Sequence, residues 1–554
     1  MTHQPVAEVA RPADRLGRPS AAVGAAPAST SAEGRSWALA TPHAVATAAG
    51  EKAFRAGGTA IDAALAAAAA LSVVYPHNCS IGGDVIALVS TPGKGTVAVD
   101  GSGAAAARTD ADALRARYRR MPVTGAQAVT VPGALAAWET IHALGGRRPL
   151  ARALDDAIEA AGGGIPVAGS LARALAANAG LLGADPGMRG VFFADEEPLA
   201  PGATLRQPAL ARSLEALAAD GASAFYDGPL GESVVATLRS LGSALQTTDL
   251  HDHGTGSATP LRRPFRGLEV LTAPPASQGF VLLEILAAVD ALGLAGPLDP
   301  LDGDAPLLAE IARLATLDRD LHLADPRLAR VPIEELLGDV RARDLADRAL
   351  RRVRRGGPAG AAIAAPRPRG DTVAVVAADA AGHAVSLIQS NFHFFGSGIL
   401  DPATGIICHN RGASFVLDPS CPNVIAPGKR PLHTLMPVLV EESGELWAAN
   451  GTMGGTVQPQ IHAQVLLRLL AGASPQEAVG APRWVVDGSG AERVSVEARV
   501  PEAARSALGA AGYGLEALPD LDEEVGHAQC LTRSPDGALV AASDPRSDGA
   551  ASAG

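Results

Sequence analysis

Thr372 is the residue of this sequence best placed to act as a nucleophile. It stands between a loop-like stretch rich in Pro and Arg, residues 366–370, and a run of small and β-branched residues, 373–378, that predicts a buried strand. Gly382 then turns the chain into a second predicted strand, residues 384–388. A threonine that becomes a chain terminus carries its own base, because its free α-amine can accept the hydroxyl proton. The alternative is an ordinary threonine that opens a strand.

Such chemistry requires that the peptide bond between Asp371 and Thr372 be cut, and we expect Thr372 to cut it by attacking the preceding carbonyl. Amide cleavage also needs hydrogen-bond donors for the developing oxyanion. Gly454 and Gly455 are candidates, because two successive glycines bring backbone N–H groups close to a substrate without interference from a Cβ atom. A plain strand-to-helix turn is the alternative for this pair.

The elements that must position these residues follow from hydrophobic periodicity. Helices are predicted over residues 60–74, 135–144, 151–161, 170–182, 208–220, 280–294, 305–323, 341–355, 460–471 and 475–481. Strands are predicted over residues 85–90, 96–100, 372–379, 384–388, 435–441 and 446–450. Helices dominate the first two-thirds of the chain, and strands appear mainly after Thr372.

Several further stretches occur in a fixed order around Thr372. Those after it are Gln389 to Gly398, Pro427 to Thr434, Asn450 to Gly455 and Ser543 to Arg546; those before it are Pro76 to Asn78, Gly82 to Asp84, Val131 to Gly133 and Pro274 to Gly279. The ordered set resembles the γ-glutamyltranspeptidase family of N-terminal nucleophile hydrolases over roughly residues 36–550. The resemblance implies an α+β fold, a four-layer αββα sandwich.

The resemblance also implies how the chain is organised. Residues 1–35 are expected to form a disordered tail, residues 36–371 the large fragment and residues 372–554 the small fragment that begins at the nucleophile. The two fragments are expected to stay together as a heterodimer, with a dimer of such heterodimers left open.

Site residues can be carried over one by one. In the family the glycine pair that matches Gly454 and Gly455 forms the oxyanion hole. The position of Ser390 holds a hydroxyl beside the nucleophile, and its neighbour Asn391 is a further candidate, although a purely structural role is an equal alternative for both. Thr434 matches a substrate-contacting serine. His433 replaces a second serine, so it either contacts substrate or is a structural loop histidine.

Two departures from the family pattern concern the acyl pocket. Ser102 stands where γ-glutamyl enzymes have an arginine for the α-carboxylate, and Ser414 stands where they have an aspartate for the α-amine. Arg411 lies near the lost aspartate and reverses the local charge, which favours a short anionic acyl group. Together with Gly370-Asp371-Thr372, this pattern is similar to the oxamate-amidohydrolase-like branch of the family. The alternative for Arg411 is a salt bridge to a nearby carboxylate such as Asp418.

Composition limits the partners. The chain of 554 residues has a net charge of −12, which disfavours nucleic acid, and 47% hydrophobic residues, enough for a large core. Its longest apolar run, residues 63–74, is too short to span a membrane. Four widely spaced cysteines match neither a zinc site nor a disulfide scaffold, and His251 and His253 lack a third metal ligand, so we expect no metal, no cofactor and a cytoplasmic location.

The leading hypothesis is therefore an autoprocessed threonine amidohydrolase or acyltransferase that acts on small-molecule amides. The first alternative is a true γ-glutamyltransferase or glutathione hydrolase that holds its substrate with other residues. A second alternative, of a different class, is a catalytically inactive relative that serves as a binding or scaffold protein.

Overall fold

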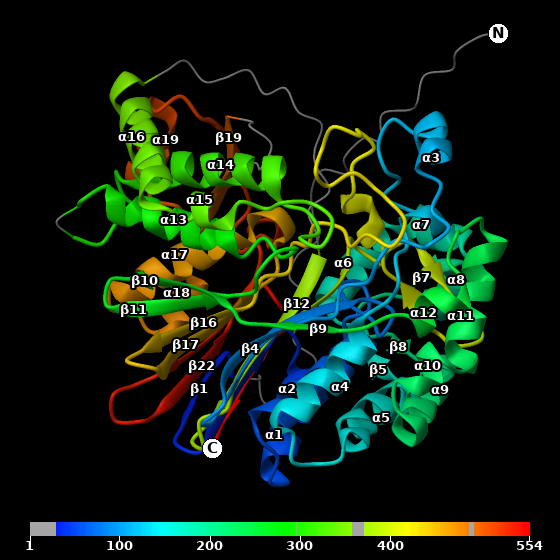
Figure 1. The fold of residues 1–554 in the computed structure, drawn as a ribbon. Coiled ribbons are helices and arrows are strands. Elements are labelled where there is room, and N and C mark those ends of the chain that lie inside the picture. Colours follow the sequence, from blue (N-terminus) through cyan, green and yellow to red (C-terminus); the bar gives the residue numbers. More distant parts are fainter. Residues whose placement is uncertain (1–28, 295, 357–370, 487–491) are drawn as a thin grey trace.

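The computed structural model describes residues 29–294, 296–356, 371–486 and 492–554, and two antiparallel sheets of seven strands lie at its centre (Figure 1). The sheet that contains Thr372, here the Thr372 sheet, has the strand order β23 (Ala550–Ala553), β2 (Trp37–Thr41), β12 (Asp371–Asp379), β13 (Ala384–Phe392), β3 (Asp84–Thr91), β4 (Gly95–Asp100) and β9 (Gly256–Ala258). The opposite sheet has the order β1 (Ser31–Gly34), β22 (Leu539–Ser543), β21 (Ala528–Arg533), β17 (Glu445–Thr452), β16 (Val438–Glu442), β11 (Leu268–Thr272) and β10 (Leu261–Phe265).

Helices cover the outer face of each sheet, so the molecule has four layers (Figure 1). On the Thr372 sheet they include α1 (Ala44–Arg55), α2 (Ala60–Val74), α4 (Ala134–Gly145), α5 (Asp155–Gly163) and α9 (Pro208–Asp220). On the opposite sheet they include α13 (Phe280–Ala291), α14 (Ala305–His322), α16 (Asp339–Arg355) and α17 (Gln458–Leu470). This is the predicted αββα sandwich. No helix of the described residues is long and apolar enough to cross a membrane.

The smaller elements complete the layers and the connections. The remaining helices are α3 (Ala111–Arg117), α6 (Gly169–Ala177), α7 (Ala179–Ala184), α8 (Pro186–Phe192), α10 (Ser223–Tyr226), α11 (Pro229–Ser240), α12 (Thr247–His251), α15 (Ile333–Leu336), α18 (Pro475–Gly480) and α19 (Glu502–Ala510). The remaining strands are β5 (Ile165–Pro166), β6 (Phe193–Ala194), β7 (Glu197–Pro198), β8 (Thr204–Leu205), β14 (Ile399–Leu400), β15 (Ile407–Cys408), β18 (Trp484–Val486), β19 (Arg493–Glu497) and β20 (Gly514–Leu518).

Strand β12 is buried on both faces, which explains its small and β-branched composition. Val373, Val375 and Ala377 pack under the helices of the Thr372 sheet. Ala374 and Val376 face the opposite sheet. Strands from after Thr372, β12 and β13, lie between strands from before it, β2 on one side and β3 on the other. A chain cut at Thr372 would therefore leave two pieces that share one core.

Some predicted boundaries were wrong. The expected helix over residues 151–161 begins as a 3₁₀ turn and becomes α5 at Asp155. The expected helix over residues 170–182 is split into α6 and α7 at Asn178, whose side-chain amide donates to the Ala174 carbonyl at 2.8 Å. The expected tail also ends too late, because Ser31–Gly34 already pairs with β22; residues 1–28 lie outside the described part of the chain.

Candidate active site

Thr372 lies near the start of β12, between the two sheets, and is wholly buried. Its Oγ1 donates to Ser390 Oγ on β13 at 3.2 Å. Ser390 shares its strand face with Ser386, whose hydroxyl donates to the Asn450 carbonyl in the opposite sheet. Asp371 and Thr372 are the first two residues of β12, so the bond proposed for cleavage lies at the start of this strand.

The Ser390 hydroxyl connects the candidate nucleophile to the bond that must be cut. Its Oγ accepts from the Phe392 N–H at 2.7 Å and donates to the Asp371 carbonyl oxygen at 2.5 Å. The ladder between β12 and β13 is irregular between Asp371 and Val373. The attacking hydroxyl, a proton relay and the scissile carbonyl thus form one hydrogen-bonded chain, which is the arrangement that attack by Thr372 on its own peptide bond requires.

Gly454 and Gly455 follow the end of β17 with positive φ angles of 144° and 54°, values that L side chains rarely adopt. A Cβ atom on Gly454 would lie 2.6 Å from Ile461 Cδ1. Two residues whose role the sequence did not reveal hold this turn. Gln278 Nε2 donates to the Gly455 carbonyl at 2.8 Å, and Arg319 Nη1 donates to both Gln278 Oε1 and the Thr456 carbonyl at 3.0 Å.

Asp84 organises a buried polar cluster beside the nucleophile. It lies opposite Ser390 in the register of β3 and β13. Its Oδ2 accepts from His409 Nδ1 and His433 Nε2, each at 3.1 Å, and from Arg411 Nε at 3.4 Å. Burial alone would raise the pKa of Asp84, but its two histidine partners lower it overall. The cluster therefore holds a carboxylate and a guanidinium inside the protein.

Arg411 is wholly buried and lies over the Phe392 ring, with 4.0 Å between Cζ and the ring centroid. Its Nη1 donates to Thr434 Oγ1 at 3.1 Å, whereas Nη2 finds no acceptor among the described residues. Burial lowers its pKa to about 10, so it stays charged at neutral pH. The suggested partner Asp418 was wrong: Asp418 accepts from Ser420 instead, and the ion pair of Arg411 is with Asp84.

The other candidates divide into two groups. Thr434 and His433 join the Arg411 cluster, and the Thr434 carbonyl accepts from the same Gln278 amide that holds Gly455. In contrast, the Ser414 hydroxyl bonds to the carbonyls of Arg411 and Leu432, which braces its own turn. Asn391 and Ser102 also belong to this second group, whose side chains lie outside the hydrogen-bonded Arg411 cluster.

The side-chain contacts of Asn391 and Ser102 differ from those of the Arg411 cluster. Asn391 Oδ1 accepts from Ser80 Oγ at 2.7 Å, and its Nδ2 donates to the Pro76 carbonyl at 3.3 Å. Its amide thus fastens the Gly-rich loop before β3. Ser102 is buried, and its Oγ has no hydrogen-bond partner in the described ranges, so no hydrogen bond from that hydroxyl joins it to the Arg411 cluster.

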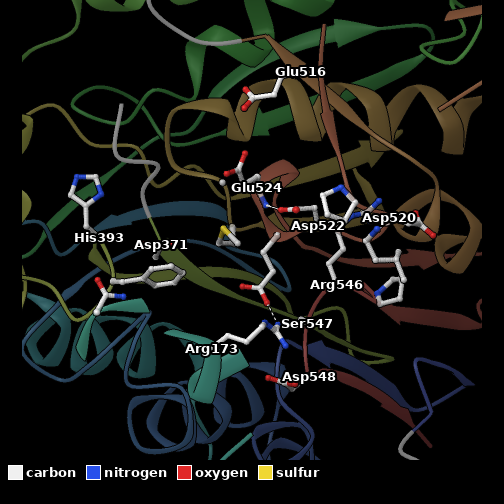
Figure 2. A pocket seen from close by; sticks show the side chains of 18 of the residues that line it. Arg173, Asp371, His393, Glu516, Asp520, Asp522, Glu524, Arg546, Ser547 and Asp548 are labelled. Atoms are coloured by element: carbon white, nitrogen blue, oxygen red, sulfur yellow. Dashed lines mark hydrogen bonds and ion pairs between the residues drawn. The ribbon is translucent and has the colours of Figure 1, made fainter. Parts of the chain in front are cut away.

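An open cleft of about 1180 Å³ reaches the scissile residue (Figure 2). Its lining includes Asp371, Phe394, Met453, Gly454, Arg173 and Asp548. Figure 2 shows Arg173 together with the acidic residues Asp522, Glu524 and Asp548 around this space. Asp371 and Gly454 border the cleft, whereas Thr372 lies behind them. The candidate oxyanion donors and the scissile bond therefore share one entrance.

Four buried histidines make stability depend on pH. Burial lowers the pKa of His43, His253, His433 and His527 to about 4 each. Between pH 4 and 6.5 these histidines are protonated in the unfolded chain but largely neutral in the folded chain. The unfolded chain therefore binds more protons, and the free energy of unfolding must rise with pH. We expect each histidine to contribute on the order of 1 kcal/mol across this window.

Urea unfolding of the Thr372→Ala precursor at pH 4.5, 5.5, 6.5 and 7.5 measures this dependence without interference from cleavage. Glu284, Asp371 and Glu523, whose pKa values burial raises, act in the opposite direction. We expect the histidines to outweigh them, because burial also lowers the pKa of His77 and His462. Stability that is flat or that increases on acidification from pH 6.5 to 4.5 would contradict the expectation.

Comparison with known proteins identifies the family to which this geometry belongs. The family model described as gamma-glutamyltranspeptidase matches residues 46–554. The chain belongs to the γ-glutamyltranspeptidase family. It is 37% identical to the oxamate amidohydrolase proenzyme of Klebsiella pneumoniae, over 92% of this chain and 97% of the relative. It is 35% identical to a glutathione hydrolase-like proenzyme of Bacillus subtilis, over 92% of this chain and 97% of the relative.

Solved structures of this family share the fold. The crystal structure of cephalosporin acylase from Bacillus halodurans superimposes with a TM-score of 0.87 and 32% identity, over 98% of this chain and 99% of that chain. The predicted fold of an N-terminal nucleophile hydrolase is confirmed. The chain is an enzyme, a hydrolase or transferase of this γ-glutamyltranspeptidase family, and the inactive-scaffold alternative is set aside.

Proposed function

We propose that the chain cleaves itself between Asp371 and Thr372 and that Thr372 then hydrolyses small amides. The observation that carries the proposal is the continuous hydrogen-bond chain from Thr372 Oγ1 through Ser390 Oγ to the Asp371 carbonyl oxygen. It supports the proposal because two hydroxyl groups and the Asp371 carbonyl are hydrogen-bonded in series at one buried position. Sequencing the amino terminus of the smaller fragment of the purified wild-type protein tests the proposal.

Self-cleavage proceeds by an acyl shift from nitrogen to oxygen. Thr372 Oγ1 attacks the Asp371 carbonyl carbon, and its proton passes through Ser390 to the carbonyl oxygen, which gives a tetrahedral intermediate. When this intermediate collapses, the proton moves from that oxygen to the nitrogen as the C–N bond breaks, so that the C=O bond re-forms, Asp371 becomes esterified to the Thr372 hydroxyl and the Thr372 nitrogen becomes an amine. Water hydrolyses the ester, which leaves an Asp371 carboxylate and a free Thr372 with its hydroxyl and amine.

Turnover uses the same atoms on an external amide. The Thr372 amine accepts the hydroxyl proton during attack and returns it to the leaving nitrogen. Backbone N–H groups of Gly454 and Gly455 stabilise the oxyanion. The resulting acyl-enzyme is released by water, and an amine that competes with water would give acyl transfer. The two-chain heterodimer follows from the cut, and the cytoplasmic location stays a prediction.

We favour an amide with a short anionic acyl group, and oxamate is the first substrate to test because a relative is named for it. The supporting feature is Arg411, which is buried beside the nucleophile and leaves Nη2 without an acceptor among the described residues. A buried donor without a partner is unfavourable, so a substrate carboxylate would satisfy it.

A second candidate, a γ-glutamyl substrate, is favoured by a different atom. Asp84 Oδ1 is also buried and lacks a partner in the described residues. A substrate ammonium on Asp84 and a carboxylate on Arg411 would bind an α-amino acid head without the two charged residues that Ser102 and Ser414 replace. The relative named glutathione hydrolase-like is compatible with this option.

Substitutions at Arg411 and Asp84 distinguish the two candidate substrate classes. Arg411→Met should lower kcat/KM for oxamate by roughly 10- to 100-fold, the loss of one charge-assisted hydrogen bond, and should affect a neutral short amide much less. The ratio of the two substrates in one preparation is measured, because partial misfolding cancels in that ratio. Arg411→Lys is the control that keeps the charge.

Asp84→Asn tests the γ-glutamyl alternative by the same ratio method. If a substrate ammonium rests on Asp84, this change should reduce turnover of a γ-glutamyl anilide more than that of oxamate, which is affected only through the ion pair of Asp84 with Arg411. Efficient γ-glutamyl turnover by the wild type that neither Arg411→Met nor Asp84→Asn diminishes would remove this cluster from substrate binding altogether.

A further inference from the structure

The side chain of Asn78 contacts the main chain of Thr372, the proposed nucleophile. Its Nδ2 donates to the Thr372 carbonyl oxygen at 3.3 Å. The side chain is 1% exposed, and its Oδ1 has no hydrogen-bond partner among the residues that the structure describes. A buried amide normally uses both of its ends, so an unpaired oxygen at this position indicates that a donor arrives later.

The strand geometry indicates which donor that is. In an extended strand the N–H and C=O groups of one residue point to the same edge. A side-chain amide whose nitrogen binds the Thr372 carbonyl therefore presents its oxygen toward the Thr372 nitrogen. Asn78 is itself fixed, because its N–H donates to the Tyr75 carbonyl at 3.0 Å and its carbonyl accepts from the Asn391 N–H at 2.8 Å.

We propose that Asn78 is a positioning residue for the α-amine of the mature enzyme. The inference rests on the proposed function, in which Thr372 becomes a chain terminus. Cleavage converts a peptide nitrogen with one hydrogen into an amine with two, or an ammonium with three. Asn78 Oδ1 accepts one of these hydrogens, which turns the nitrogen lone pair toward Thr372 Oγ1. Asn78 acts only through the amine and does not touch the substrate.

The pH dependence of turnover reports on this contact, because the amine is a base only when it is neutral. The titratable and charged groups near it include Asp371, Glu523, Asp548 and Arg173 on the cleft side and Asp84, Arg411, His433, His77 and His527 on the buried side. Burial holds the pKa of His77 well below its usual range and those of His433 and His527 at about 4, whereas Asp84 and Arg411 keep their charges near neutral pH. Burial raises the pKa of Asp371, so the contact of Asn78 with the amine is read from the displacement of the acidic limb between variants and not from its absolute position. The reference pKa of an α-amine is about 7.7–8.0.

The test compares pH profiles of kcat/KM for wild type and two variants, with whichever of oxamate and a γ-glutamyl anilide the wild type turns over better. In Asn78→Asp a carboxylate would stabilise the ammonium and raise its pKa, so the acidic limb should move to higher pH by about one unit or more. In Asn78→Ala the ammonium loses its acceptor, so the limb should move to lower pH, and kcat should fall.

Two controls separate this role from a structural one. Asn423→Ala removes another buried amide, one whose two ends bind the Ser414 carbonyl and the Leu432 N–H. It should lower thermal stability without moving the acidic limb. Asn78→Ser, which keeps a smaller oxygen acceptor, is the second variant should Asn78→Asp fail to cleave, and its limb should lie between those of wild type and Asn78→Ala.

The outcomes are distinguishable from failure of the proposed function. Before each profile, sequencing must show that the small fragment begins at Thr372. An acidic limb that is unchanged in correctly cleaved Asn78 variants would overturn the role of Asn78 alone. A fragment that begins elsewhere, or activity without cleavage, would overturn the proposed function instead.

Discussion

Replacing Thr372 by alanine is expected to leave a single full-length chain that has no measurable amidase activity. The change removes the hydroxyl that we propose attacks both the Asp371 carbonyl and an external amide. Loss of a nucleophile typically lowers kcat by at least about 10³-fold, and here it also prevents the amine base from forming. A denaturing gel and an amidase assay on the purified protein measure both effects.

Two companion variants define the effect. Thr372→Ser keeps the hydroxyl and should retain part of both cleavage and activity. Thr316→Ala removes another buried threonine, whose hydroxyl donates to the Ala312 carbonyl within α14, and should cleave normally. A Thr372→Ala chain that is still cut at the same bond would show that another group performs the cleavage.

Gly455→Val is expected to reduce kcat by about 10²–10³-fold, the usual effect of losing one oxyanion donor. A valine cannot adopt the φ of 54° found at Gly455 without strain, so the turn and its N–H groups must move. Because the donors act on charge that develops during reaction, KM should change much less than kcat. Steady-state kinetics on the processed variant measure the split.

Gly472→Val serves as the matched control. Gly472 also has a positive φ, of 91°, but nothing lies within 4 Å of its would-be Cβ atom and it is remote from the cleft lining. The Gly472→Val variant should be less stable than the wild type but should have the same kcat. An unchanged kcat in Gly455→Val would remove the glycine pair from the mechanism.

The sequence predicted best what local patterns determine. The alternation after Thr372 indicates the buried hairpin of β12 and β13, and the glycines at 454 and 455 indicate a turn that no larger residue adopts easily. The apolar run over residues 60–74 likewise indicates α2. Each of these signals lies within a few residues of the structure it specifies.

Contacts between distant parts of the chain escaped prediction for a physical reason. Asp418, seven residues from Arg411, was the predicted partner, but the ion pair of Arg411 is with Asp84. The backbone of the two preceding residues bonds to the carbonyls of Gly82 and Asn391, which holds Arg411 beside the start of β3. The amide of Asn391 was a binding candidate, yet loop backbone and Ser80 satisfy it. Pairing of strands decides which polar groups meet, and that pairing has no local signature.

The side chains that hold the turn of Gly454 and Gly455 could not be predicted from local sequence either. Gln278 and Arg319 come from segments far earlier in the sequence, the first just before α13 and the second on α14. Only the tertiary packing of these segments brings them to the Gly455 and Thr456 carbonyls. The stretch around Gln278 could be recognised as a family motif, but nothing in it revealed that its amide joins the turn to the Thr434 carbonyl.

The most direct test of the central claim is the amino-terminal sequence of the smaller fragment of the purified wild-type enzyme. Self-cleavage by Thr372 predicts two chains, residues 1–371 and 372–554, and a smaller fragment that begins Thr-Val-Ala-Val-Val. A single uncleaved chain with full amidase activity, or a fragment that begins at any other residue, would contradict the claim that Thr372 is the nucleophile.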